Sequence, residues 1–156
     1  DKLVESGKVR ALGVSNFSAE TLERAHKLSA YGIACNQVHY NLTYREPETS
    51  GLLHWCQSNG VILSAWRPLQ YGDLLQDPPI LVTELAIKYN ATAAQIALNW
   101  LISQPNVATL VKTSNPEHLR ENIGALGWKM DVKDIERLRN EFPGAQPISN
   151  RIRLDG

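Results

Sequence analysis

The sequence predicts an α/β protein in which a parallel sheet is covered by helices. Short stretches rich in β-forming residues alternate four times with stretches of helical periodicity, which is the pattern of βαβ units. The third of these stretches, "VILSAW" at 61–66, is almost wholly apolar. Such a composition is typical of a parallel strand that is buried on both faces.

The expected elements follow in order along the chain. Strands are expected at 9–14, 33–38, 61–66 and 106–112. Helices are expected at 1–7, 18–28, 49–58, 80–89, 115–124 and from 92 and 131 onward, with a loop at 67–79. Ser18 and Asp131 are expected N-caps, and "TAAQ" at 92–95 has the spacing of a capping box. The tail from residue 143 has no period that predicts an element.

The composition predicts one soluble domain over residues 1–156. Sixteen basic residues balance sixteen acidic ones, so neither nucleic acid nor an acidic membrane surface is an expected partner. No apolar stretch approaches the roughly 18 residues of a membrane span, and the expected location is cytoplasmic. Cys35 and Cys56 lack the spacing of metal ligands and are either reduced core residues or one disulfide. Because Asp1 stands inside a helical pattern, we expect the chain to be part of something longer.

Small polar or aromatic residues stand at the end of every expected strand. They are Ser15 and Asn16, Asn36 and Gln37, Trp66 and Arg67, and Lys112 and Thr113. Because ligands of parallel α/β proteins bind at the carboxyl ends of the strands, the recurrence predicts one shared site. Taken singly, each residue has a structural explanation, such as a turn position or a core aromatic ring.

The residue types at these strand ends favour particular chemical groups. Ser15, Asn16 and Gln37 offer the donors and acceptors that a planar carboxamide needs. Trp66 offers a face on which an aromatic ring can stack, and Lys112 with its neighbouring hydroxyl groups suits a phosphate. Together they predict a nicotinamide dinucleotide that lies across the strand ends. No G-x-G-x-x-G follows a strand, so a Rossmann cradle is not expected.

The stretch "TLVKTSNPEHLREN" at 109–122 joins the fourth strand to a helix and has two explanations. A helix N-terminus offers unpaired N–H groups, so Lys112 and the polar residues after it could seat a phosphate. The other explanation is a capped helix, with Ser114 or Asn115 as the N-cap and Pro116 in the first turn.

Four motifs resemble those of the aldo-keto reductases. They are "GKVRALGVSNF", "NQVHYN", "AWRPL" and "LVKTSNPEHLREN", in the order and at the spacing of that family, and the match runs from Gly7 to about Leu138. The resemblance implies a (β/α)8 barrel of which this chain holds strands β5 to β8. The chain would then be a parallel (β/α) half barrel, the C-terminal half, with the N-terminal half absent.

The resemblance also assigns cofactor roles by position. The nicotinamide end would be held by Ser15, Asn16, Gln37 and the stacking ring of Trp66, where most members carry Tyr. Leu69 would lie beside the pyrophosphate, and the adenosine end would be held by Lys112, Thr113, Glu121 and Asn122. His118 stands where many members carry an Arg that braces the 2′-phosphate. NADP(H) is therefore expected with a weakened preference, and NAD(H) is the alternative.

The family's catalytic Asp, Tyr, Lys and His belong to the half that is expected to be absent. No catalytic residue is assigned, because Tyr40, Tyr44, His39 and His54 lie in the wrong segments. The resemblance implies an NAD(P)H-dependent reductase of small aldehydes or ketones as the whole protein, with this chain inactive alone. The alternative is a non-catalytic half-barrel module that associates with itself or with the missing half, because a half barrel leaves two sheet edges unpaired.

Overall fold

The computed structural model describes residues 1–142 apart from the side chains of residues 71 and 73. In it, the four predicted β-rich stretches form one sheet. The strands are β1 (Gly13–Ser15), β2 (Cys35–His39), β3 (Ile62–Trp66) and β4 (Val107–Leu110). They lie in the order β1-β2-β3-β4, and every neighbouring pair is parallel. The predicted parallel α/β architecture with four strands is confirmed.

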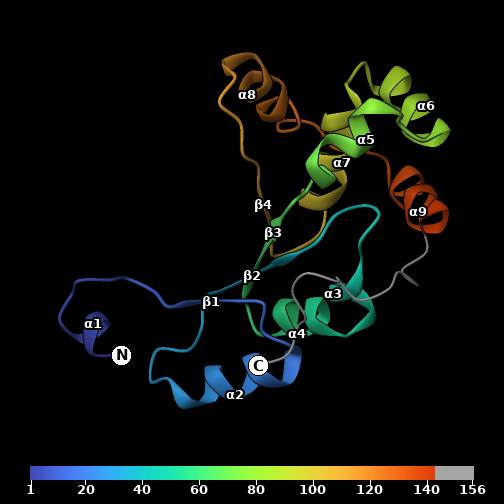
Figure 1. Ribbon diagram of the computed structural model, residues 1–156. Helices are drawn as coiled ribbons and strands as arrows, with labels where there is room; N and C mark the ends of the chain where they lie inside the picture. The colour runs from blue at the N-terminus through green and yellow to red at the C-terminus, as the bar shows by residue number, and fades with distance from the viewer. Residues whose placement is uncertain (143–156) are drawn as a thin grey trace.

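Helices lie between the strands along the chain, and those that pack on the sheet, such as α4 and α7, cover one side of it (Figure 1). They are α1 (Lys2–Glu5), α2 (Ala19–Leu28), α3 (Glu46–Thr49), α4 (Leu52–Ser58), α5 (Asp73–Gln76), α6 (Ile80–Tyr89), α7 (Ala93–Ile102), α8 (Pro116–Ile123) and α9 (Val132–Glu141), with a 3-10 turn η1 at Gln70–Gly72. None of the helices within residues 1–142 combines the length and the apolar character that a membrane span needs.

Side-chain caps explain where several helices begin. The Ser18 hydroxyl accepts from the Thr21 N–H at 3.2 Å, and both hydrogen bonds of the predicted capping box between Thr92 and Gln95 are present. Asp131 precedes α9 as predicted but makes no side-chain cap, because its carboxylate binds Lys88 at 3.0 Å instead.

Several boundaries differ from the sequence-based prediction. The helix expected at 49–58 begins only at Leu52 as α4, because Gly51 before it has φ 78°, a left-handed conformation that interrupts a helix. The short helix α3 lies mostly before this range, where no element was expected. The stretch 67–79 was expected to be a loop but contains η1 and α5. The first strand is shorter than the expected 9–14, since only 13–15 pair with β2.

The two faces of the sheet differ in how much they are covered. Residues that pair in register project to the same face, so alternate positions divide the strands into two sets. The outer set packs against the helices and contributes Val38, Leu63 and Ala65 to the core. The inner set includes Ile62 and Leu110, which are 46% and 51% exposed.

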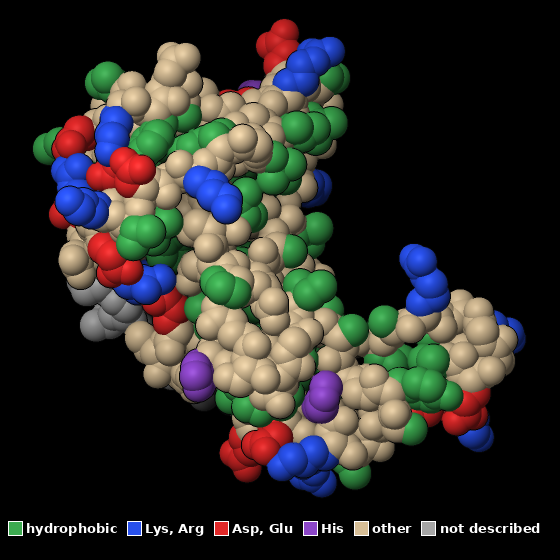
Figure 2. All heavy atoms as spheres, turned by 180° about the vertical axis from the view of Figure 1, so that it is seen from behind, with side chains coloured by type: hydrophobic (Ala, Val, Ile, Leu, Met, Phe, Trp, Pro, Cys, Tyr) green, Lys and Arg blue, Asp and Glu red, His purple; other side chains and the backbone are tan. Residues whose placement is uncertain are grey.

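The exposure of the inner face contradicts one prediction. "VILSAW" was expected to be buried on both faces, but only its outer-face residues are buried, since the described chain places no second layer over the inner face. Figure 2 shows the consequence as a crescent whose hollow opens between the arm that carries α1 and the part that carries α8. Cys35 and Cys56 are free thiols, so the disulfide alternative is not realised.

Candidate functional site

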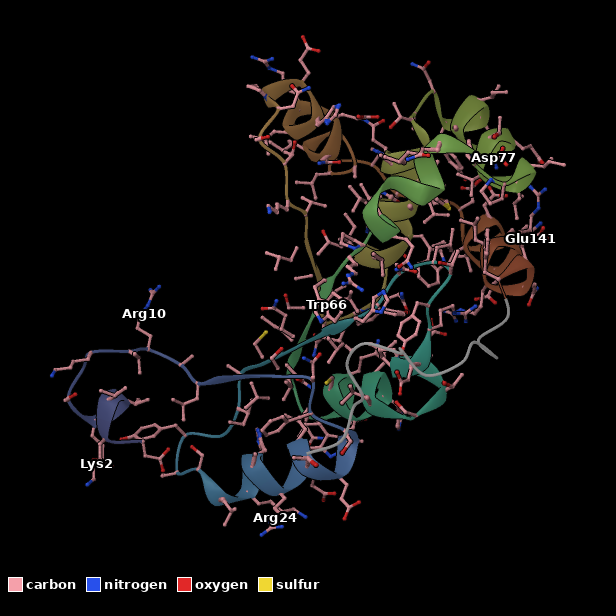
Figure 3. The ribbon with its side chains drawn as sticks, viewed as in Figure 1. Lys2, Arg10, Arg24, Trp66, Asp77 and Glu141 are labelled. Atoms are coloured by element: carbon pink, nitrogen blue, oxygen red, sulfur yellow. The ribbon has the colours of Figure 1, made fainter. Side chains whose placement is uncertain are left out.

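A pocket of about 610 Å³ lies at the carboxyl ends of β3 and β4. It is bounded by the segment after β3, the end of β4 and one face of α8. Seven of the ten residues predicted to hold a cofactor line it: Trp66, Leu69, Lys112, Thr113, His118, Glu121 and Asn122. The stick view in Figure 3 labels Trp66, which lies on the sheet where the hollow begins.

The three other predicted residues lie on the neighbouring strands and are bonded to one another. The backbone carbonyl of Gln37 accepts from the Ser15 hydroxyl at 3.0 Å and from the Asn16 N–H at 2.9 Å. The Asn16 side-chain oxygen accepts from Trp66 Nε1 at 3.3 Å, and Asn16 adopts the left-handed conformation with φ 59°. These bonds join the ends of β1, β2 and β3 into one framework. They also occupy polar groups that the sequence suggested for a carboxamide.

Electrostatics at the Trp66 end are set by two neighbours. The guanidinium of Arg67 lies 4.7 Å from the centre of the Trp66 ring. The imidazole of His39 lies parallel to that ring on the next strand, with ring centres 4.6 Å apart. Burial lowers the pKa of His39 to about 4, with Arg67 adding to the effect and a hydrogen bond to Gln70 opposing it. His39 is therefore neutral at pH 7.

At the other end of the pocket, β4 leads into α8. The Thr113 hydroxyl accepts from the Asn115 N–H at 3.0 Å, and the Asn115 side chain accepts from the Glu117 N–H at 2.8 Å. Asn115 is thus the N-cap, and the capped-helix explanation of this stretch describes its local structure. Lys112 stays exposed at the pocket rim beside this helix start, so a role toward an anion is still open to it.

The face of α8 that borders the pocket follows from helical spacing. His118, Glu121 and Asn122 are three and four residues apart and so lie on one face. The sequence had no signal for the apolar lining supplied by Leu75 and Leu110, because one lay in an expected loop and the other in an expected strand.

The four residues excluded as catalytic groups all lie outside this pocket lining. The Tyr40 phenol is fully buried, donates to Glu48 Oε1 at 2.6 Å and accepts from Gln104 Nε2 at 2.6 Å. Burial raises the pKa of Tyr40 well above its ordinary value, and the charge of Glu48 adds to the effect. The Tyr44 hydroxyl donates a hydrogen bond to the Glu46 carboxylate. His54 borders a different pocket.

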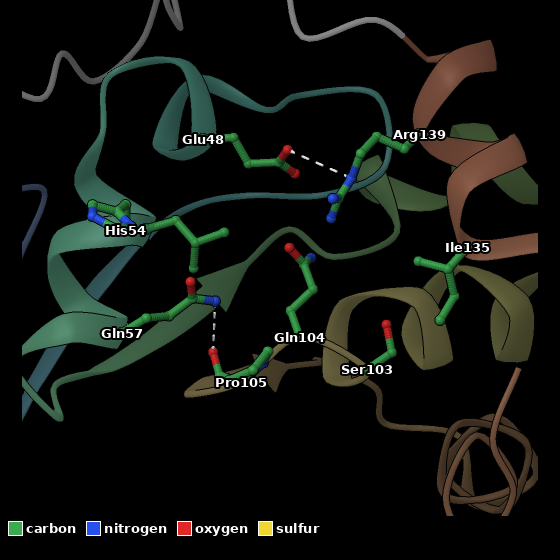
Figure 4. Close-up of a pocket in the computed structure, with 9 residues that line it drawn as sticks. Glu48, His54, Gln57, Ser103, Gln104, Pro105, Ile135 and Arg139 are labelled. Carbon is green, nitrogen blue, oxygen red and sulfur yellow. Dashed lines mark hydrogen bonds and ion pairs between the residues drawn. The ribbon is translucent and has the colours of Figure 1, made fainter. Parts of the chain in front are cut away.

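That second pocket, of about 400 Å³, lies among the outer helices and was not predicted. Figure 4 shows residues of α3, α4, the end of α7 and α9 around it. Arg139 Nε lies 4.0 Å from Glu48 Oε2, and Gln57 donates to the Pro105 carbonyl at 3.0 Å. It is separate from the strand ends that hold the predicted site. Within residues 1–142, no cluster of His, Cys, Asp and Glu could hold a metal ion.

Comparisons with known proteins find chains that resemble this one in sequence and in fold. The glyoxal reductase of Bacillus subtilis is 34% identical over 153 residues, which are 94% of this chain and 52% of that protein. The methylglyoxal reductase YeaE of Escherichia coli is 31% identical over 147 residues, 92% of this chain and 51% of that protein. The crystal structure of a thermostable aldo-keto reductase, Tm1743, with the inhibitor epalrestat superposes with a TM-score of 0.85 and 40% identity, covering 89% of this chain and 51% of that one.

The chain spans about half the length of the relatives it matches. This extent agrees with a half barrel, but the comparisons do not bear out the narrower placement in the C-terminal half. The model of the aldo/keto reductase family matches residues 1–140, nearly the whole described chain. This chain therefore belongs to the aldo/keto reductase family.

Proposed function

We propose that this chain holds the nicotinamide cofactor of an NAD(P)H-dependent reductase that, as the whole protein, reduces aldehydes or ketones. The observation that carries the proposal is the pocket itself, whose lining includes both the ring of Trp66 and the exposed Lys112. Apolar side chains such as Leu69, Leu75 and Leu110 line the same pocket. A dinucleotide has matching parts, since it carries a flat ring at one end and phosphates along its length.

The same pocket favours NADP(H) over NAD(H). Lys112 supplies a charge for the 2′-phosphate, and His118 and Thr113 border the same end. Glu121 also lies there, and its negative charge opposes a phosphate, so the preference is modest. A structural neighbour supports a phosphorylated cofactor: a mutant of Gox0644 in complex with NADPH has a TM-score of 0.77 and 25% identity, and covers 99% of this chain and 50% of that one. When bound, the nicotinamide supplies the hydride.

Small 2-oxoaldehydes are the substrates we propose to test first. Two relatives that are 31 to 34% identical are a glyoxal reductase and a methylglyoxal reductase.

We further propose that the isolated chain does not turn over. General acid catalysis contributes about 10²- to 10⁴-fold and needs a group within hydrogen-bond reach of the carbonyl oxygen. In the described residues, the phenol of Tyr40 is committed to Glu48 and Gln104 in the core. Such an acid would come from the complementary half of the barrel. The strand numbering β5 to β8 stays a prediction from the order of the motifs.

A second function is favoured by the exposed inner face. Ile62 and Leu110 present apolar surface there, and β1 and β4 are the two edges of the sheet. A half barrel with these features would serve as a module that associates with itself or with a complementary half.

One experiment separates the two functions. NADPH consumption with glyoxal, methylglyoxal and a wider aldehyde panel is followed for the chain alone and after mixing with the other half of a family barrel, while light scattering gives the mass. We expect the chain alone to bind NADP⁺ without consuming NADPH, and we expect NADPH consumption after the two halves are mixed. Association without any NADP⁺ binding would support the module instead. A complete reading frame that continues after residue 156 rather than before residue 1 would contradict the strand numbering and place the chain at the N-terminal part of its relatives.

A further inference from the structure

Three rings from β2, the segment after it and β3 form a continuous stack beside the candidate cofactor pocket. The His39 and Tyr44 rings are 4.0 Å apart with an angle of 8° between their planes. The His39 and Trp66 rings are 4.6 Å apart with an angle of 18°. Because His39 and Trp66 pair directly in the register of β2 and β3, both rings lie on the inner face of the sheet.

Hydrogen bonds hold the middle ring of this stack in place. His39 Nε2 lies 3.1 Å from Gln70 Oε1 and 3.2 Å from Asn41 Nδ2. Asn41, which is fully buried, donates to the same Gln70 oxygen at 2.9 Å and to the Arg67 carbonyl at 2.9 Å. Its own oxygen accepts from the Tyr44 N–H at 2.8 Å. Asn41 thereby ties together the segments that carry the outer rings.

Trp66 itself has less to hold it. Within residues 1–142 its side chain makes one hydrogen bond, from Nε1 to Asn16 at 3.3 Å. The Arg67 guanidinium also contacts the ring, but on a long and adaptable side chain. Within residues 1–142, the parallel ring of His39, which is itself buried, lies against the indole and restricts its plane.

We infer that His39 is a positioning residue: together with Tyr44 it fixes the plane of the Trp66 ring and so the face on which the nicotinamide stacks. The inference rests on the proposed function, because it assumes that Trp66 faces the cofactor. The neutral state of His39 suits this place, since a second cation next to the indole would repel an oxidised nicotinamide ring. The other ring nitrogen of His39, Nδ1, is buried and has no hydrogen-bond partner in the described chain.

The test uses ¹⁵N-labelled tryptophan in the 156-residue chain, whose four indole N–H signals include one that disappears in Trp66→Phe. His39→Leu removes the ring and keeps an apolar side chain, whereas His39→Phe keeps a ring and loses the nitrogens. The affinity for NADP⁺ probes the whole site, whereas the affinity for adenosine 2′,5′-bisphosphate probes only the part near Lys112. We expect His39→Leu to shift the Trp66 indole signal and to weaken NADP⁺ binding about 2- to 10-fold, while the affinity for the bisphosphate stays the same. His39→Phe should restore NADP⁺ affinity to within about 2-fold of the unsubstituted chain.

Two results would overturn the inference. One is an unmoved Trp66 signal in folded His39→Leu, and the other is an equal loss of affinity for both ligands. If His39→Leu does not fold, Tyr44→Leu takes its place, since it removes the support behind His39 and should give the same selective loss. A chain that binds neither ligand would contradict the proposed function and the cofactor part of the inference with it. The indole signal would then still decide whether His39 positions Trp66.

Discussion

Arg45 joins the segment after β2 to the end of α9, and we predict that Arg45→Met destabilises the chain strongly. Its side chain is 6% exposed and donates to Glu48 from Nε at 3.0 Å and from Nη2 at 2.6 Å. It also donates to the backbone carbonyls of Arg139, at 2.8 Å, and Phe142. Cations are favoured at helix C-termini, where carbonyls lack partners, so this side chain completes the last turn of α9.

The magnitude follows from what the substitution leaves behind. Removing one partner of a buried ion pair costs about 3 to 5 kcal/mol, because the other charge stays buried without compensation. Glu48 would keep the Tyr40 hydroxyl at 2.6 Å and Arg139 at 4.0 Å, so the lower end, about 3 kcal/mol, is expected. In a chain of this length such a loss lowers the Tm by roughly 6 to 12 °C.

Urea unfolding followed by far-UV circular dichroism measures the effect. Lys27→Met is the matched control, because its ion pair with Glu23 is exposed on both sides and should contribute less than about 1 kcal/mol. Adding Glu48→Leu to Arg45→Met should recover part of the loss, since it removes the stranded carboxylate. A loss below about 1 kcal/mol in Arg45→Met alone would refute the reasoning.

The same pair has a pH dependence of defined sign. Burial raises the pKa of Glu48, but the hydrogen bonds from Arg45 and Tyr40 and the charges of Arg45 and Arg139 outweigh it, and the net pKa lies below its ordinary value. A carboxyl group with a lowered folded pKa stabilises the fold above its unfolded pKa, about 4.3, and loses that contribution as the pH falls through the folded value. The difference in free energy of unfolding between the unsubstituted chain and Arg45→Met should therefore become smaller below about pH 4.

Three further predictions concern the cofactor site and the inner face. Lys112→Met should weaken NADP⁺ about 10-fold and NAD⁺ less than about 2-fold, because it removes a charge-assisted bond to the 2′-phosphate; equal losses by calorimetry would contradict this. The chain should lose up to about 3 kcal/mol of stability between pH 6.5 and about 4, because the unfolded His39 takes up a proton before the folded one does. His39→Phe should not show this loss of stability with falling pH. If the urea midpoints of the unsubstituted chain and of His39→Phe fall in parallel over this pH range, the prediction is wrong. Ile62→Lys with Leu110→Lys should reduce self-association in sedimentation velocity, and an unsubstituted chain that stays monomeric at high concentration would exclude this use of the inner face.

The parts of the fold that the sequence predicts are those that depend on local pattern. The capping box at 92–95 and the cap at Ser18 are local hydrogen bonds, and both are present. The alternation of strands and helices predicted the parallel order, because each connection carries a helical pattern and is long enough for a crossover. The start of α4 shows the limit, since the helical pattern from residue 49 did not reveal that Gly51 is left-handed and that the helix begins at Leu52.

The parts that could not be predicted depend on contacts between distant segments. The exposure of Ile62 follows from what covers the inner face, and an apolar composition carries no information about that. Within the site, the residue types pointed to the strand ends, and the pocket does collect most of them. The bond between Asn16 and Trp66 joins residues 50 apart, and that between His39 and Gln70 joins residues 31 apart, so neither has a sequence signal.

The inner face changes character from one end of the strands to the other. Its first layer, Gly13, Cys35 and Ile62, is small or apolar. The next layer holds Ser15, Gln37, Ser64 and Ala108, and the last holds His39, Trp66 and Leu110 beside the pocket. In a closed barrel the interior is filled by layers of side chains from alternate strands. Apolar side chains at one end and the proposed cofactor site at the other thus share a single surface. Whatever covers the first layer also restricts the strands that carry the last one, so closure of the barrel and binding of the cofactor should favour each other.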